Sequence, residues 1–170
     1  MISKGLIKDV TAFVLVALLG YLNIAAQDEP IRFQQIGNLE DYSSIDTYCI
    51  FQDSKGLIWI GTRMGLDRWD GNHIQSYRFD PSHPQGMPYK GVTGITEDNQ
   101  NTLWLVSEDG FLFNFDLEKE TFNQFTLPWD KDKNWRYYLK IVSYIKYDTS
   151  GIVWLGTPQG LVGYHFAQDS

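Results

Sequence analysis

A motif that recurs three times at nearly constant spacing limits the possible fold more than any other feature of this sequence. Each copy has an Asp, a Trp six residues later within an apolar run, and a Gly six residues after the Trp. The aspartates lie 45 and then 50 residues apart. A repeat of this length predicts a series of equivalent units, each packed on its neighbours. Three positions recur in the same register in every copy: Asp53, Asp98 and Asp148; Trp59, Trp104 and Trp154; Gly65, Gly110 and Gly160.

The segment that begins at each Asp predicts a tight hairpin turn. Asp caps such a turn through its side chain, and a Gly three residues later takes the left-handed conformation. Gly56 and Gly151 hold that position in the first and third copies, and Asn101 holds it in the second. Asn is the other residue that tolerates this conformation. The apolar run that follows predicts a buried strand with Trp at its centre.

A second hairpin follows each Trp strand. Thr62 and Thr157 begin a Thr-x-x-Gly turn, whereas the second copy has Val106-Ser107 in place of Gly-Thr. Gly61 and Gly156 beside the Trp predict close strand packing. We therefore assign a structural role to the repeat positions Asp53, Gly56, Trp59, Gly61, Thr62, Gly65, Asp98, Trp104, Gly110, Asp148, Gly151, Trp154, Gly156, Thr157 and Gly160.

Four short strands per 45 to 50 residues are typical of a propeller blade. A β-sandwich shares the short strands but not the fixed-period motif. The sequence thus predicts an all-β fold: a partial β-propeller of about three four-stranded antiparallel blades, preceded by an N-terminal signal helix. The blades are expected at about residues 45–80, 90–127 and 140–170. Three blades do not close a ring and leave sheet faces bare, so we expect a fragment of a longer protein; a ring assembled from several chains is the alternative.

The N-terminus has the pattern of a secretory signal peptide. Lys4 and Lys8 precede an apolar run over residues 10–22, and small residues end it at Ala26. We predict residues 1–26 as the signal peptide and 27–170 as the propeller fragment, exported from the cytoplasm. An uncleaved signal anchor is the alternative, although Gly20 interrupts the run.

Composition excludes several classes of function. The formal net charge of -7 and the lack of a basic cluster argue against nucleic acid as a partner. Cys49 is the single cysteine, so no disulfide framework or Cys-based metal site is expected. His73, His83 and His165 are scattered, with no nucleophile motif nearby. We predict no catalytic residue, no metal and no cofactor.

The repeated string Asp-x-x-Gly-x-Ile/Val-Trp-Ile/Leu-Gly-Thr-x-x-Gly-Leu resembles the two-component regulator propeller repeat, over roughly residues 31–165. The lead-in at residues 33–36 and the segment 67–71 also resemble the start of such sensors. The resemblance implies the N-terminal part of the periplasmic, ligand-sensing propeller of a Bacteroidetes hybrid histidine kinase. It further implies polysaccharide-derived ligands, a homodimer, an inner-membrane anchor, and further blades and kinase modules in the full-length protein. This sequence shows no phospho-acceptor or ATP-binding segment, so we expect no enzymatic activity from this chain. An exported propeller lyase and a non-enzymatic interaction scaffold are the alternatives.

The loops between blades are the candidate ligand-binding region. If the strand ending at Asp53 is the innermost of its blade, the Asp turns lie on one face of the disc, and the Thr turns and the links lie on the other. The links at residues 81–91 and 128–140 combine aromatic and charged side chains, which suit sugar rings. We predict an oligosaccharide- or partner-binding surface formed by Arg63, Tyr89, Trp129, Trp135, Arg136 and Tyr137. The alternative is that these links are only wide connections whose aromatics fold inward.

Overall fold

The computed structural model describes residues 13–14, 32–80, 82–83, 86–124, 142 and 144–165. The chain divides into two units, Met1–Gln35 and Ile36–Ser170. Of the first unit, Phe13 and Val14 are helical and exposed, and residues 32–35 are non-helical and exposed. The predicted signal peptide otherwise lies outside the described residues. Among the described residues, no helix is long and apolar enough to cross a membrane.

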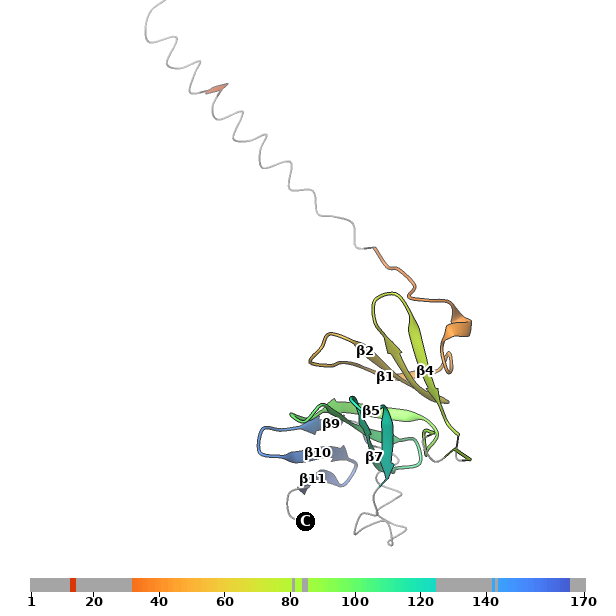
Figure 1. The fold of residues 1–170 in the computed structure, drawn as a ribbon. Coiled ribbons are helices and arrows are strands. Elements are labelled where there is room, and N and C mark those ends of the chain that lie inside the picture. The colour runs from red at the N-terminus through yellow and green to blue at the C-terminus, as the bar shows by residue number, and fades with distance from the viewer. Residues whose placement is uncertain are drawn as a thin grey trace, which may run out of the picture. The chain divides into compact units, whose positions relative to one another are not determined.

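The second unit is built from antiparallel sheets, one for each repeat (Figure 1). The first sheet contains β1 (Thr47–Gln52), β2 (Ile58–Thr62), β3 (Gly65–Trp69) and β4 (Ile74–Arg78), in that order. The second contains β5 (Val92–Glu97), β6 (Thr102–Ser107), β7 (Leu112–Asp116) and β8 (Thr121–Gln124). The third contains β9 (Tyr144–Tyr147), β10 (Ile152–Thr157) and β11 (Gly160–His165). The all-β fold of stacked blades is confirmed, with three strands in the third blade as far as the structure describes it.

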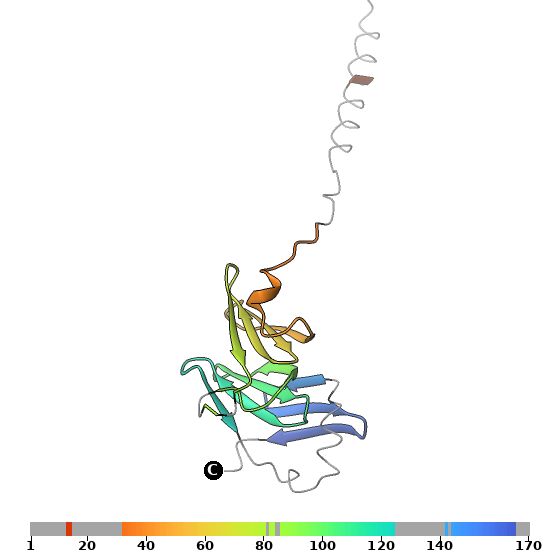
Figure 2. The ribbon, with the colours of Figure 1, turned by 90° about the vertical axis from the view of Figure 1, so that its right-hand side faces the viewer.

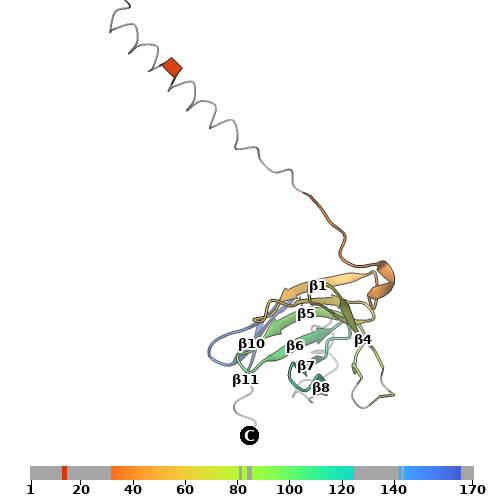
Figure 3. The same ribbon diagram turned by 45° about the horizontal axis from the view of Figure 1, so that its top comes forward.

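Each blade begins with its innermost strand. β1 contacts β5 and β5 contacts β9, so the three first strands run beside one another (Figures 1 and 3). The chain then proceeds outward strand by strand and returns through a link to the next inner strand. Two further bonds place the Thr turns beside the links: Phe79 N–H donates to Met64 O, and Glu108 N–H donates to Gly91 O. The described part of the link between the first two blades therefore lies beside the Thr turns, as expected, whereas the link at residues 128–140 lies outside the described residues.

The Asp turns have one geometry in all three blades. In the first, Asp53 Oδ1 accepts from the backbone N–H of Lys55 and Leu57, each at 2.9 Å, and Oδ2 accepts from Trp59 Nε1 at 2.8 Å. Asp98 and Asp148 make the equivalent bonds, including indole bonds of 2.9 and 2.6 Å. One carboxylate thus caps the turn and also orients the Trp of the next strand.

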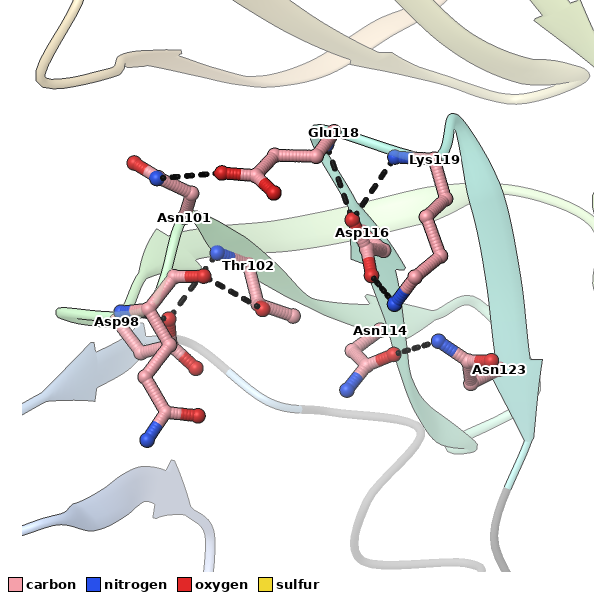
Figure 4. A network of polar contacts seen from close by, with 9 residues as sticks. Asp98, Asn101, Thr102, Asn114, Asp116, Glu118, Lys119 and Asn123 are labelled. Carbon is pink, nitrogen blue, oxygen red and sulfur yellow. Dashed lines mark hydrogen bonds and ion pairs between the residues drawn. The ribbon is translucent and has the colours of Figure 1, made fainter.

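Backbone conformation at the turns follows the choice of residue. Gly56 and Gly151 have φ of +86° and +85°, and Asn101 has φ of +57°. In the turn between β7 and β8, Asp116 Oδ1 accepts from the N–H of Glu118 and Lys119 (Figure 4). Asn101 Nδ2 reaches Glu118 Oε1 at 3.4 Å, which joins the two turns on this side of the blade. Asp70 Oδ1 accepts in the same way as Asp116 Oδ1 in the turn between β3 and β4.

Two apolar cores lie between the blades, and each contains a Trp of the repeat. Trp59, fully buried, packs with Leu103, Leu105 and Phe115 of the second blade. Trp104, 5% exposed, packs with the third blade through Val153 and Leu155. Trp154 is half-buried on the opposite face of the third blade. The first and second blades therefore each present their Trp to the blade that follows. Figure 2 shows the backbone of these neighbouring sheets.

The innermost strand pair carries one glycine in each blade. Cys49 pairs with Gly61, Gly94 with Val106, and Tyr144 with Gly156. A Cβ on Gly61 would overlap both Cys49 Sγ and the Val92 carbonyl oxygen of the second blade. In the first blade the glycine is on the second strand, whereas in the second blade it is on the inner strand. The inner strand of the next blade approaches so closely that only one of the two paired positions has room for a side chain.

A segment before the first blade packs along its outer strands. The 3-10 helix η1 (Leu39–Asp41) contacts β4, and Ser76 Oγ donates to Asp41 O at 2.9 Å. Ser43 then donates its N–H and hydroxyl to Asp67, which is fully buried in β3. Burial raises the pKa of Asp67, and the bonds from Ser76 and Ser43 partly oppose that rise.

Candidate ligand-binding surface

The face that carries the Thr turns and the links holds the described part of the predicted surface. Arg63 follows the Thr62 hydroxyl, which accepts the N–H of Gly65 at 3.1 Å and so closes this turn. The Arg63 side chain is 62% exposed, and its guanidinium forms an ion pair with Asp46 at 3.5 Å. Such an exposed pair contributes little to stability, so the guanidinium is available to a ligand.

Tyr89 lies in the link before β5 and is half-buried. Its ring stacks on Phe111, with centroids 4.2 Å apart and planes 9° apart, and meets Phe113 edge-on at 5.3 Å. Its hydroxyl donates to Gln124 Oε1 at 3.3 Å. The link thus folds this aromatic ring onto the second blade, as the inward alternative expects, and leaves it partly exposed.

The other predicted residues of the surface, Trp129, Trp135, Arg136 and Tyr137, lie outside the described residues. Lys90, next to Tyr89, places its ammonium over the Phe79 ring at 5.4 Å from the centroid. The described part of this face is therefore a mixture of aromatic rings and cationic groups.

A groove that sequence reasoning did not identify lies between the outer strands of the first two blades. Its volume is about 380 Å³, and it is open to solvent. Its lining comes from β4, from β8 and from the link between the blades: Tyr77, Arg78, Asp80, His83, Gly86, Met87 and Phe122. Tyr77 and Phe122 meet here edge to face at 6.1 Å. No local motif marks them, because two outer strands 45 residues apart come together only when the blades pack.

Charged groups line one side of this groove. Asp80 Oδ2 lies 3.0 Å from His83 Nδ1, and Asp80 also accepts from the Ser82 hydroxyl and N–H. The bonds from Ser82, followed by the contact with His83, lower the pKa of Asp80. The Asp80 carboxylate is therefore ionised at neutral pH and serves as a hydrogen-bond acceptor.

The structure offers no support for metal chemistry in the part of the chain that it describes. Within those residues, no group of three His, Cys, Asp or Glu side chains converges as a metal ion requires. Asp53, Asp98 and Asp148 instead use both carboxylate oxygens on their own turns and indoles. Burial raises the pKa of the Cys49 thiol to about 12, so this cysteine is a poor nucleophile at neutral pH.

Antiparallel blades stacked in chain order, each entered at its inner strand, define a β-propeller segment. Residues 41–64 match the family described as two component regulator propeller. The resemblance of the first repeat to this family is therefore confirmed. The matched residues contain the first Asp turn, the Trp strand and the first half of the Thr turn.

One curated relative and two solved structures are similar to parts of this chain. A curated relative, "Histidine kinase P4" of Formosa agariphila, is 32% identical over 60 residues, which are 35% of this chain and 4% of that protein. The extracellular domain of a hybrid two component system from B. thetaiotaomicron superposes with a TM-score of 0.57 at 20% identity, over 78% of this chain and 20% of that domain. The extracellular domain of a one component system from the same organism gives a TM-score of 0.51 at 25% identity, over 69% of this chain and 16% of that domain. The chain thus spans a fifth or less of the length of each of these proteins.

Proposed function

We propose that this chain is the N-terminal part of the extracytoplasmic, ligand-sensing propeller of a hybrid two-component histidine kinase. The observation that carries the proposal is the regulator propeller repeat at residues 41–64 within a stack of propeller blades. The names of the relatives support it, since they include a histidine kinase and extracellular domains of regulatory systems. In this proposal residues 1–26 direct export, residues 27–170 form the periplasmic propeller portion, and the remaining blades and kinase modules belong to a membrane-anchored, homodimeric full-length protein.

We further propose that the ligand derives from a polysaccharide and binds the face of the Thr turns and links. The flat Tyr89–Phe111 stack and the exposed Arg63 guanidinium support this choice. Sugar C–H faces pack on aromatic rings, while hydroxyl groups accept hydrogen bonds from Arg. Trp129, Trp135, Arg136 and Tyr137 extend the same surface in the proposal.

The test uses the mature chain and a panel of defined short oligosaccharides, with binding measured by thermal shift and then by titration calorimetry. We expect at least one oligosaccharide to bind, and the Trp135→Ala, Arg136→Ala variant to bind it about tenfold more weakly, a loss of about 1.4 kcal/mol. Lys55→Ala, on the opposite face, is the matched control and keeps full affinity. Unchanged binding by the double variant would exclude this surface, and release of an unsaturated sugar product would identify a lyase instead.

A further inference from the structure

The Asp turns of consecutive blades are joined by side chains at two fixed positions. Ser54, the residue after Asp53, donates its N–H and its hydroxyl to the Glu97 carboxylate at 2.7 and 2.9 Å. Glu97 is the residue immediately before Asp98. The hydrogen-bond donors thus belong to the residue just after the Asp of the first blade. The acceptor belongs to the residue just before the Asp of the second blade.

The contact between the second and third blades uses the same two positions. Asn99 follows Asp98, and Tyr147 precedes Asp148. Tyr147 donates its hydroxyl to Asn99 Oδ1 at 3.1 Å. The chemistry at the two positions changes from one interface to the next, whereas their places in the repeat do not. The pair therefore follows from the geometry of the stack and is matched separately at each interface.

The third blade presents the first of these two positions, the residue after the Asp, on an open face. Thr149 follows Asp148 and is exposed. The register of β9, β10 and β11 places Trp154 on the same sheet face as Tyr144 and Leu161, which are 63% and 69% exposed. In the first two blades the equivalent Trp is buried by the next blade. The open face therefore continues an interface that the structure already shows twice.

We propose that this face binds one further blade of the same repeat, and that the incoming blade carries a carboxylate or amide oxygen immediately before its Asp. Thr149 has the same donors as Ser54, an N–H and a hydroxyl, and Ser54 is matched by a carboxylate. This proposal rests on the proposed function in that it places more propeller beside the third blade, but it makes no use of any sugar ligand.

The experiment extends the full chain with its own sequence. Residues 70–124 are repeated once after Tyr164, which supplies an outer strand, a link and a second copy of the blade whose Glu97 would meet Thr149. We expect hydrogen exchange at the β10 amides to slow by about tenfold or more in the extended chain relative to the original chain. Leu161→Asp should abolish that protection in the extended chain while leaving the original chain unchanged.

The side-chain pair is tested in the extended chain by a double-mutant cycle. Thr149→Val and Glu97→Ala in the second copy should each cut the protection, and together they should do no more than either alone. Glu118→Ala in the second copy is the matched control. Equal protection in all variants would overturn the role of the pair, and absence of protection in the unaltered extended chain would overturn the docking surface. The alternative is that a second copy of the chain binds this face, and sedimentation of the original chain tests it. A dimer that Leu161→Asp dissociates would assign this face to self-association. None of these readouts depends on oligosaccharide binding, so failure here and failure of the proposed function are separate results.

Discussion

The indole N–H of Trp59 donates to Oδ2 of Asp53 at 2.8 Å, and the same pair recurs in the other two blades. Asp53 is only 5% exposed. Asp53→Ala would leave three N–H groups without their acceptor, each costing on the order of 1 kcal/mol or more. We expect a loss of about 3 kcal/mol in the free energy of unfolding, measured by urea denaturation. Asp46→Ala, at an exposed ion pair, should cost less than about 1 kcal/mol, and equal effects of the two variants would contradict the capping role.

Asn101 tests the backbone requirement of the same turn. Its φ of +57° lies in the left-handed region, where a residue with an ordinary side chain is strained. Asn101→Ala should lower the free energy of unfolding by about 1 kcal/mol, whereas Asn101→Gly should not lower it. Thermal denaturation of the two variants makes the comparison, and a Gly variant as unstable as the Ala variant would point instead to the bond with Glu118.

The pairing of Cys49 with Gly61 predicts that a second substitution can restore part of the stability lost by the first. Gly61→Ala forces a methyl group against Cys49 Sγ and the Val92 carbonyl oxygen, and overpacking of this kind costs about 1–3 kcal/mol. Cys49→Gly in the same chain recreates the arrangement of Gly94 and Val106 in the second blade. It should recover part of the lost stability, because only the contact with Val92 remains. Additive losses in the double variant, measured by urea denaturation, would show that the two positions are independent.

Alkaline pH should destabilise the folded chain through Cys49. Burial raises its pKa from 9.0 to about 12, so above about pH 9 the unfolded chain releases a proton that the folded chain retains. The free energy of unfolding therefore falls as the pH rises through this window. Cys49→Ala should flatten the decline between about pH 9 and pH 10. Above that, Tyr77, whose pKa burial raises to about 12, contributes in the same direction. An unchanged slope in the Cys49 variant would show that the thiol is not the titrating group.

The repeat made most of the fold predictable. Spacing and residue chemistry located the turns at Asp53, Asp98 and Asp148, because each turn depends on bonds within a few residues. The sequence offers no reason for Val106, which stands where the other two repeats have glycine. Its explanation, the glycine at position 94, lies on another strand and becomes visible only once the register is known.

The candidate site was less predictable, because it depends on how separate segments meet. Tyr89 was expected to contribute to an exposed aromatic surface, and the structure stacks its ring on Phe111, which lies just before β7. The groove between Tyr77 and Phe122 was not foreseen for the same reason. Local chemistry identifies turns, whereas surfaces that two blades share require the packing itself.

The contact between Ser43 and the buried Asp67 has a mechanical consequence. Tension applied to the chain before Ile36 would reach the hydrogen bonds of Ser43, Ser76 and Arg78 before it reached β1. These bonds lie across the outer strands of the first blade, so the load would be shared by the sheet and would not peel its inner strand away. The short segment at residues 36–43 would thus transmit tension from the preceding residues to the outer strands of the first blade.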